Sequence, residues 1–127
     1  MTASREPVLT RASVRDGAHL CAVGACRPDQ REMDTALVRD ARVFVDSRVG
    51  ALAEAGDLVI PIREGAIDAS HIAGELGDVF GGRTPGRRNA GEITIFKSLG
   101  MAVEDVAAAR LAFDRASERG LGRGFVL

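Results

Sequence analysis

The stretch AHLCAVG, residues 18–24, decides how this chain is expected to fold. Its apolar residues follow one another without strict alternation, which is typical of a strand buried on both faces of a parallel sheet. The stretch ends in the small residues Ala22-Val23-Gly24, where the carboxyl end of the strand would reach the surface. Small residues let another molecule approach the backbone closely. We therefore expect a buried strand that ends at a binding surface.

Strands and helices are predicted to alternate along the rest of the chain. Further strands are expected over residues 42–46 and 92–97. Helices are expected after Asp34, from Ser47 to a left-handed glycine cap at Gly56, over residues 70–80, and from residue 101 to about 119. Residues 57–69, with a proline and a glycine, are interpreted as a loop, and the tail 121–127 as unclassified or an added edge strand. This order predicts an α/β domain with a mainly parallel sheet. Three strands are few for such a sheet, so we expect part of a larger one.

Composition limits the class of protein. The chain has 127 residues, 46% hydrophobic and 28% charged, with a formal net charge of −1. That near-neutral charge provides no electrostatic surface for nucleic acid or an anionic membrane. No apolar run approaches the ~20 residues of a membrane-spanning helix, and the start of the chain lacks the apolar core of a signal peptide. We expect a cytoplasmic protein of one domain, with no nucleic-acid or membrane partner.

The cysteines, histidines and the single lysine form no recognised motif. Cys21 and Cys26 lack the CxxC spacing, and His19 and His71 lie far apart, so no metal site is expected. Cys21 is interpreted as a small buried thiol. Lys97 is the only lysine among 17 basic residues. Two interpretations remain open for it: a functional amine, or a side chain that reaches solvent from the end of a strand.

Two turns at predicted strand ends are candidates for ligand binding. Residues 23–26 follow the first strand and residues 98–100 follow the last one. Open parallel sheets bind ligands outside the carboxyl ends of their strands. The second turn also precedes a helix N-terminus, which favours polar or anionic ligands, although Ser98 could instead cap that helix. No GxGxxG, GxSxG or Ser-His-acid spacing is present, so the residues alone leave the catalytic residues unknown.

Five segments in order cover nearly the whole chain and carry a resemblance: TASREPVL, GAHLCAVGACRPDQREMD, VFVDSRVGALAEAGDL, GELGDVFGGRTPGR and ITIFKSLGMAVEDVAAARLAFDRA. They resemble the ornithine cyclodeaminase/mu-crystallin family, and are closer to its mu-crystallin and ketimine reductase branch. The resemblance implies a Rossmann-like fold, a nicotinamide cofactor (NAD or NADP), and small amino or imino acids as substrates. The chemistry it implies is hydride transfer at a carbon that bears nitrogen.

The resemblance also assigns expected roles by position. Residues expected to contact the cofactor are Thr2, Val23, Gly24, Ala25 and Ser98. Leu99 and Cys26 are expected at the substrate. Cys26 falls where the deaminases carry an acid/base aspartate, and a neutral thiol does not replace a carboxylate as a base. This departure argues against ornithine deamination, whereas Lys97 agrees with mu-crystallin.

Family members are much longer than this chain. The resemblance therefore implies that residues 1–127 are the C-terminal portion of a Rossmann-type NAD(P)-binding domain, whose last helix (about 101–119) returns toward a missing substrate and dimerisation domain. We expect weak or absent NAD(P)H binding by the isolated chain, because the glycine-rich phosphate turn is absent. We also expect a homo-oligomer. The expected function is an NAD(P)-dependent ketimine reductase or amino-acid dehydrogenase or deaminase; the alternative is a non-catalytic remnant or small-ligand binding module.

Overall fold

Four parallel strands form the centre of the computed structural model, which describes residues 2–125. The strands are β1 (His19–Ala22), β2 (Arg42–Val45), β3 (Ile72–Glu75) and β4 (Thr94–Lys97), and they lie in the order β1-β4-β2-β3. The register pairs His19 with Thr94 and Ala22 with Lys97, so β1 and β4 end at the same level. The predicted α/β class with a parallel sheet is confirmed.

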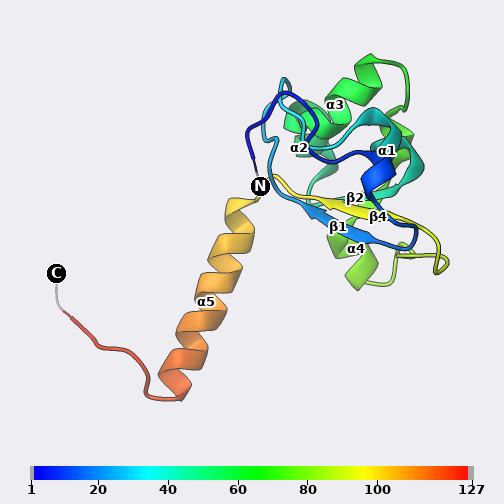
Figure 1. The fold of residues 1–127 in the computed structure, drawn as a ribbon. Helices are drawn as coiled ribbons and strands as arrows, with labels where there is room; N and C mark the ends of the chain where they lie inside the picture. Colours follow the sequence, from blue (N-terminus) through cyan, green and yellow to red (C-terminus); the bar gives the residue numbers. More distant parts are fainter. Residues whose placement is uncertain (1, 126–127) are drawn as a thin grey trace.

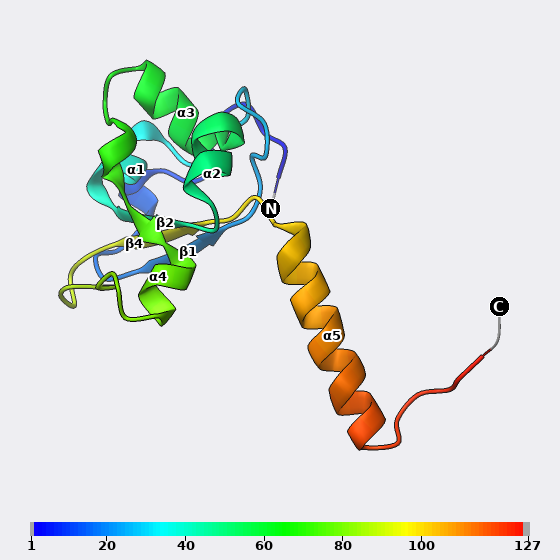
Figure 2. The ribbon, with the colours of Figure 1, turned by 180° about the vertical axis from the view of Figure 1, so that it is seen from behind.

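Three helices cover one face of the sheet, as Figures 1 and 2 show. They are α1 (Thr35–Asp40), α2 (Arg48–Glu54) and α3 (Gly56–Arg63). The predicted caps of the first two are confirmed: Asp34 accepts a hydrogen bond from the Leu37 N–H, and Ser47 accepts one from the Gly50 N–H. The main core lies between these helices and the sheet, with Leu37, Val38, Val43, Leu58 and Ile95 at its centre.

Three predictions for residues 56–80 are wrong. The expected loop over 57–69 begins as α3, with Pro61 buried inside the helix. Burial of its apolar side chains outweighs the low helix propensity of proline there. The expected helix over 70–80 is instead a short 3₁₀ turn (Ala69–His71), then β3, then the helix α4 (Leu76–Phe80). Residues 72–75 form a strand rather than a helix because they pair with β2 in the sheet. Gly56 is also not a left-handed cap, because it begins α3.

The edge strand β1 differs from the strand buried on both faces that its sequence predicts. Leu20 and Ala22 turn toward the helical layer, whereas His19 and Cys21 are exposed on the opposite face. The interpretation of Cys21 as a buried thiol is therefore wrong. The physical reason is that α1, α2 and α3 pack on the other face of the sheet, so the side chains of His19 and Cys21 point away from the main core.

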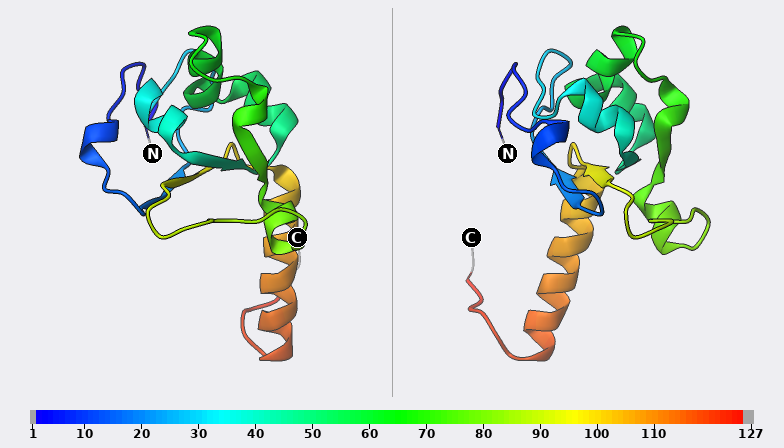
Figure 3. Two further views of the ribbon diagram at one scale, coloured as in Figure 1. Left: turned by 90° about the vertical axis from the view of Figure 1, so that its right-hand side faces the viewer. Right: turned by 45° about the vertical axis from the view of Figure 1, so that its right-hand side comes forward.

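The helix α5 (Ala102–Glu118) confirms the predicted long C-terminal helix. It projects away from the sheet in every view (Figures 1 and 3), and nearly all its residues are exposed. Residues 121–125 form no strand, and the remainder of the predicted tail lies outside the described residues. No helix in the described part of the chain is long and apolar enough to cross a membrane.

Candidate functional site

Three segments that are distant in sequence meet at the carboxyl ends of β1 and β4. The Ser98 N–H donates to the Ala22 carbonyl at 3.0 Å, which joins the two strand-end turns. The Ala25 N–H donates to the Thr2 carbonyl at 3.2 Å, which adds the N-terminal segment. A surface hollow here is lined by Thr2, Ala3, Val23, Gly24, Ala25, Cys26, Arg27 and Gln30. The structure thus brings together the residues that the sequence singled out on the first turn and at Thr2.

The first turn, residues 23–26, presents backbone and small side chains. Val23 is 41% exposed and Cys26 is exposed, and the Cys26 thiol donates to the Val23 carbonyl at 3.4 Å. Ala25 is buried and has a left-handed φ of 51°, which is uncommon for a residue other than glycine. Such a conformation persists only where the surroundings hold it. Here the Ala25 carbonyl accepts from the Gly56 N–H at 3.3 Å.

The second turn, residues 98–100, is held by one carboxylate. Asp46, which follows β2, accepts hydrogen bonds at Oδ2 from the Ser98 hydroxyl (3.1 Å) and from the Leu99 and Gly100 N–H groups (2.7 and 2.9 Å). The residue that caps α5 is Met101, with no side-chain hydrogen bond, so capping of that helix by Ser98 is wrong. The Leu99 side chain is partly buried and packs against the core.

Asp46 is accordingly a stabilised anion. Burial raises the pKa of this carboxyl, but the backbone N–H groups and the Ser98 hydroxyl that donate to it outweigh burial, and the pKa lies below its ordinary value. A lowered pKa in the folded state contributes stability above the ordinary aspartate pKa of about 3.9. That stability is lost as pH falls through the folded-state value.

Replacing Asp46 by asparagine is therefore expected to lower the stability of the chain mainly at neutral pH. Loss of the charged acceptor should lower the free energy of unfolding by about 1–2 kcal/mol, after allowance for partial solvent screening. The gap between parent and variant should narrow only as pH falls below the ordinary aspartate pKa and through the lowered folded-state value, because the parent then becomes protonated as well. Urea unfolding at neutral pH and at a series of acidic pH values measures this. Asp29→Asn is the control, since Asp29 forms an exposed ion pair with Arg5; a gap for Asp46→Asn that does not change with pH would contradict the assignment.

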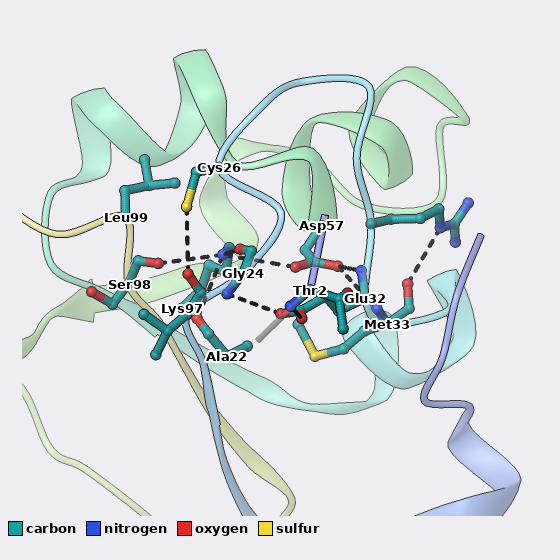
Figure 4. A network of polar contacts seen from close by, with 12 residues as sticks. Thr2, Ala22, Gly24, Cys26, Glu32, Met33, Asp57, Lys97, Ser98 and Leu99 are labelled. Atoms are coloured by element: carbon teal, nitrogen blue, oxygen red, sulfur yellow. Dashed lines mark hydrogen bonds and ion pairs between the residues drawn. The ribbon is translucent and has the colours of Figure 1, made fainter. Parts of the chain in front are cut away.

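Lys97 lies behind both turns and is fully buried. Its Nζ donates to the carbonyl oxygens of Ala22 (3.5 Å), Ser98 (3.3 Å) and Gly24 (Figure 4). The interpretation of Lys97 as a side chain that reaches solvent is wrong. With its ammonium group occupied by carbonyls from both turns, Lys97 fixes the turns relative to each other.

Two buried carboxylates complete this network, and the sequence analysis did not identify either. Asp57 Oδ2 lies 3.8 Å from Lys97 Nζ, while its Oδ1 accepts from the Glu32 and Met33 N–H groups at 2.7 and 3.0 Å. Burial raises the pKa of Asp57 above its ordinary value despite these donors. The Glu32 carboxylate accepts from the Gly24 N–H at 3.0 Å and from the Thr2 N–H (Figure 4). The unusual lone lysine was the one sequence signal that pointed to this network.

The arrangement suits binding more than acid–base chemistry by this chain itself. The ionisable side chains among the residues that line the hollow are the Cys26 thiol and the Arg27 guanidinium, and no carboxylate lines it. The buried charges instead hold backbone groups in place. The described residues contain no group of three or more histidine, cysteine or acidic side chains that could hold a metal ion.

The parallel sheet and the paired strand-end turns define a Rossmann-like α/β domain. Residues 1–120 match the model of the ornithine cyclodeaminase/mu-crystallin family, and the chain belongs to this family. It is 41% identical to a Delta(1)-pyrroline-2-carboxylate reductase of Bacillus cereus, over 95% of this chain and 37% of the relative. It is 46% identical to the ketimine reductase mu-crystallin of Mus musculus, over 90% of this chain and 34% of the relative.

Solved structures agree with this assignment. The Delta(1)-pyrroline-2-carboxylate reductase of Thermococcus litoralis, in complex with NADH and L-proline, superposes with a TM-score of 0.88 at 44% identity. The match covers 98% of this chain and 38% of that one. An archaeal alanine dehydrogenase dimer with bound NAD superposes with a TM-score of 0.84 at 32% identity, covering 99% of this chain and 39% of that one. The chain thus spans little more than a third of the length of these relatives.

Proposed function

We propose that this chain is part of an NAD(P)-dependent reductase or dehydrogenase that acts on small imino or amino acids. Residues 1–127 would be the C-terminal portion of its Rossmann-type cofactor domain, with α5 leading toward a substrate and dimerisation domain. The observation that carries the proposal is the pair of adjacent turns at the ends of β1 and β4, held by buried charges. The resemblance to reductases with bound NADH supports the choice of cofactor.

The nicotinamide half of the cofactor fits the first turn. The exposed residue Val23 and the adjoining hollow leave room for a flat ring beside the backbone of this turn. The residues that would hold this half are Thr2, Val23, Gly24, Ala25 and Ser98. When bound, the nicotinamide supplies or accepts a hydride. The chain's own contribution is to orient the ring with fixed backbone groups, while Lys97 and Glu32 keep the turn rigid.

Cys26 and Leu99 are proposed to border the substrate. The Cys26 side chain is exposed at the hollow, whereas Leu99 reaches its position from the second turn. A thiol that donates to the Val23 carbonyl does not provide the carboxylate base that loss of ammonia from ornithine requires. The proposed reaction is therefore reduction of an imine or oxidation of an amino acid, rather than deamination.

Titration of the isotope-labelled chain with NADH tests this function. We expect the amide signals of Gly24, Ala25 and Leu99 to shift in the NMR spectrum at millimolar concentrations of NADH. Binding should be this weak because the phosphate-binding turn that strengthens cofactor binding is absent from this chain. Val23→Asp should weaken these shifts, because it adds a negative charge at a surface that the anionic dinucleotide must approach. Val49→Asp, on the exposed face of α2, is the matched control.

Two outcomes would contradict the proposal. Shifts clustered away from both turns would place the ligand elsewhere. Shifts produced by L-proline or a cyclic imino acid alone, with none from NADH, would instead favour the alternative of a small-ligand binding module.

Self-association follows from the exposed apolar residues of α5. Val106 and Phe113 are 67% and 68% exposed and lie seven residues apart, on one side of the helix. We expect the chain to form at least dimers at micromolar concentration, and the double variant Val106→Glu, Phe113→Glu to shift toward monomer. Sedimentation velocity measures both, with Val49→Glu as the control. A monomeric parent chain would refute this expectation.

A further inference from the structure

The edge strand β1 presents a cysteine and a histidine on its open face. Cys21 Sγ lies 3.7 Å from His19 Nε2, and both residues are exposed. They are two residues apart in a strand, so their side chains point to the same side of the sheet. We propose that Cys21 and His19 form a nucleophile–base pair, and that Cys21 is a site of covalent modification by soft carbon electrophiles of the α,β-unsaturated carbonyl class.

The histidine ring is oriented by a third residue. His19 Nδ1 lies 2.7 Å from Oγ1 of Thr94, its partner in the strand register. Thr94 is buried, and its hydroxyl oxygen also accepts from the Arg87 guanidinium at 3.0 Å. These contacts turn Nε2 toward Cys21. A nucleophile, a base within reach and a group that orients the base are the three parts of an activated nucleophile.

The charged form of the pair has its hydrogen-bonding groups satisfied. Once the thiol proton has moved to Nε2, that N–H donates to the Cys21 thiolate. The Nδ1–H then donates to Thr94 Oγ1, which has a second lone pair beside the one that accepts from Arg87. In that form, neither N–H group of the imidazolium is left without an acceptor.

Cys21 is exposed on the face of β1 that lies opposite the helical layer, so a small electrophile can reach its Sγ atom from solvent. The proposed step is an addition. The Cys21 thiolate forms a C–S bond to the β-carbon, and the electron pair of the C=C bond moves to the α-carbon. That carbon takes the proton from His19, so all atoms of both reactants are retained in the product.

Cys26 is the matched comparison within the same chain. It is exposed like Cys21, but its thiol donates to the Val23 carbonyl rather than to a base. Exposure alone would make the two thiols similarly reactive. The proposal instead predicts that Cys21 reacts faster, because only Cys21 has an oriented histidine within hydrogen-bond distance among the described contacts.

Acrylamide, a simple α,β-unsaturated amide, is the probe. Two variants, each with one cysteine, separate the thiols: Cys26→Ser leaves Cys21, and Cys21→Ser leaves Cys26. Mass spectrometry follows the addition near neutral pH, and the same chains in denaturant give the intrinsic thiol rate. We expect Cys21 to react at least about tenfold faster than either Cys26 or its own denatured form, a modest share of the ~100-fold that general-base assistance can provide.

Variants of the base and of its orienting residue complete the test. In the Cys26→Ser background, His19→Gln should lower the folded-state rate to within about twofold of the denatured rate. Thr94→Val should lower it partly, and Thr94→Ser, which keeps the hydroxyl, should restore it. Circular dichroism confirms that each variant is folded. Equal rates for Cys21 and Cys26, or a Cys21 rate that His19→Gln leaves unchanged, would overturn the proposal.

Discussion

Replacing Lys97 by methionine is expected to lower the free energy of unfolding by about 3–5 kcal/mol, the range for breaking a buried ion pair. Methionine nearly matches the length of the lysine side chain, so the change removes the ammonium group with little loss of volume. Three backbone carbonyls then lose a donor, and the buried Asp57 loses its cation. Urea unfolding measures the effect, with Arg63→Met at the exposed end of α3 as a control for loss of a positive charge.

A double-mutant cycle separates the ion pair from the carbonyl contacts. Asp57→Asn removes the carboxylate charge, so Lys97→Met should cost less in that background than in the parent. The loss of unfolding free energy that remains in the Asp57→Asn background is due to the contacts of Lys97 with the carbonyl groups of Ala22, Gly24 and Ser98. A loss below about 1 kcal/mol for Lys97→Met in the parent would show that the network does not hold the two turns.

Gly56→Ala is expected to destabilise the chain by about 3 kcal/mol or more, at the upper end of the effects of overpacking. A methyl group at this position would overlap with the backbone carbonyl oxygens of Gln30 and Arg27. Backbone atoms cannot rotate away as a flexible side chain can. The loop after Cys26 would have to move, and the hydrogen bond from the Gly56 N–H to Ala25 would be strained. The substitution should therefore disturb the candidate site as well as lower the free energy of unfolding.

Gly77→Ala is the matched control for that substitution. Gly77 lies in α4, and the position of an added methyl group there has open space around it. Alanine should be neutral there or stabilise by up to about 1 kcal/mol, because it has the higher helix propensity. Thermal unfolding compares the two variants. If Gly56→Ala changes thermal stability no more than Gly77→Ala does, the close approach of residues 27–30 is not the reason for glycine at position 56.

Much of the fold and the place of the candidate site could be predicted from the sequence. The caps at Asp34 and Ser47 depend on atoms a few residues away, so the sequence pattern was sufficient to identify them. The strands around residues 20, 43 and 95 are apolar runs bounded by turns, and each is present in the sheet. The two turns of the candidate site follow from the ends of those strands.

Predictions that required knowledge of distant partners were the ones that failed. Residues 70–80 have an apolar spacing that suits a helix, but pairing with β2 makes residues 72–75 a strand. Pro61 suggests a loop, but burial keeps it in α3. Cys21 has the sequence context of a core residue, but it lies on an edge strand with its face uncovered.

The sequence by itself determined the class of fold and the two turns, because periodicity, caps and strand ends are local properties of the chain. Only the tertiary structure decided how those turns are held. Lys97, Asp57 and Glu32 come from segments distant in sequence, and each would be ordinary on a surface. They act together because folding removes them from water. A buried ammonium or carboxylate group is stable only with partners that the fold places beside it.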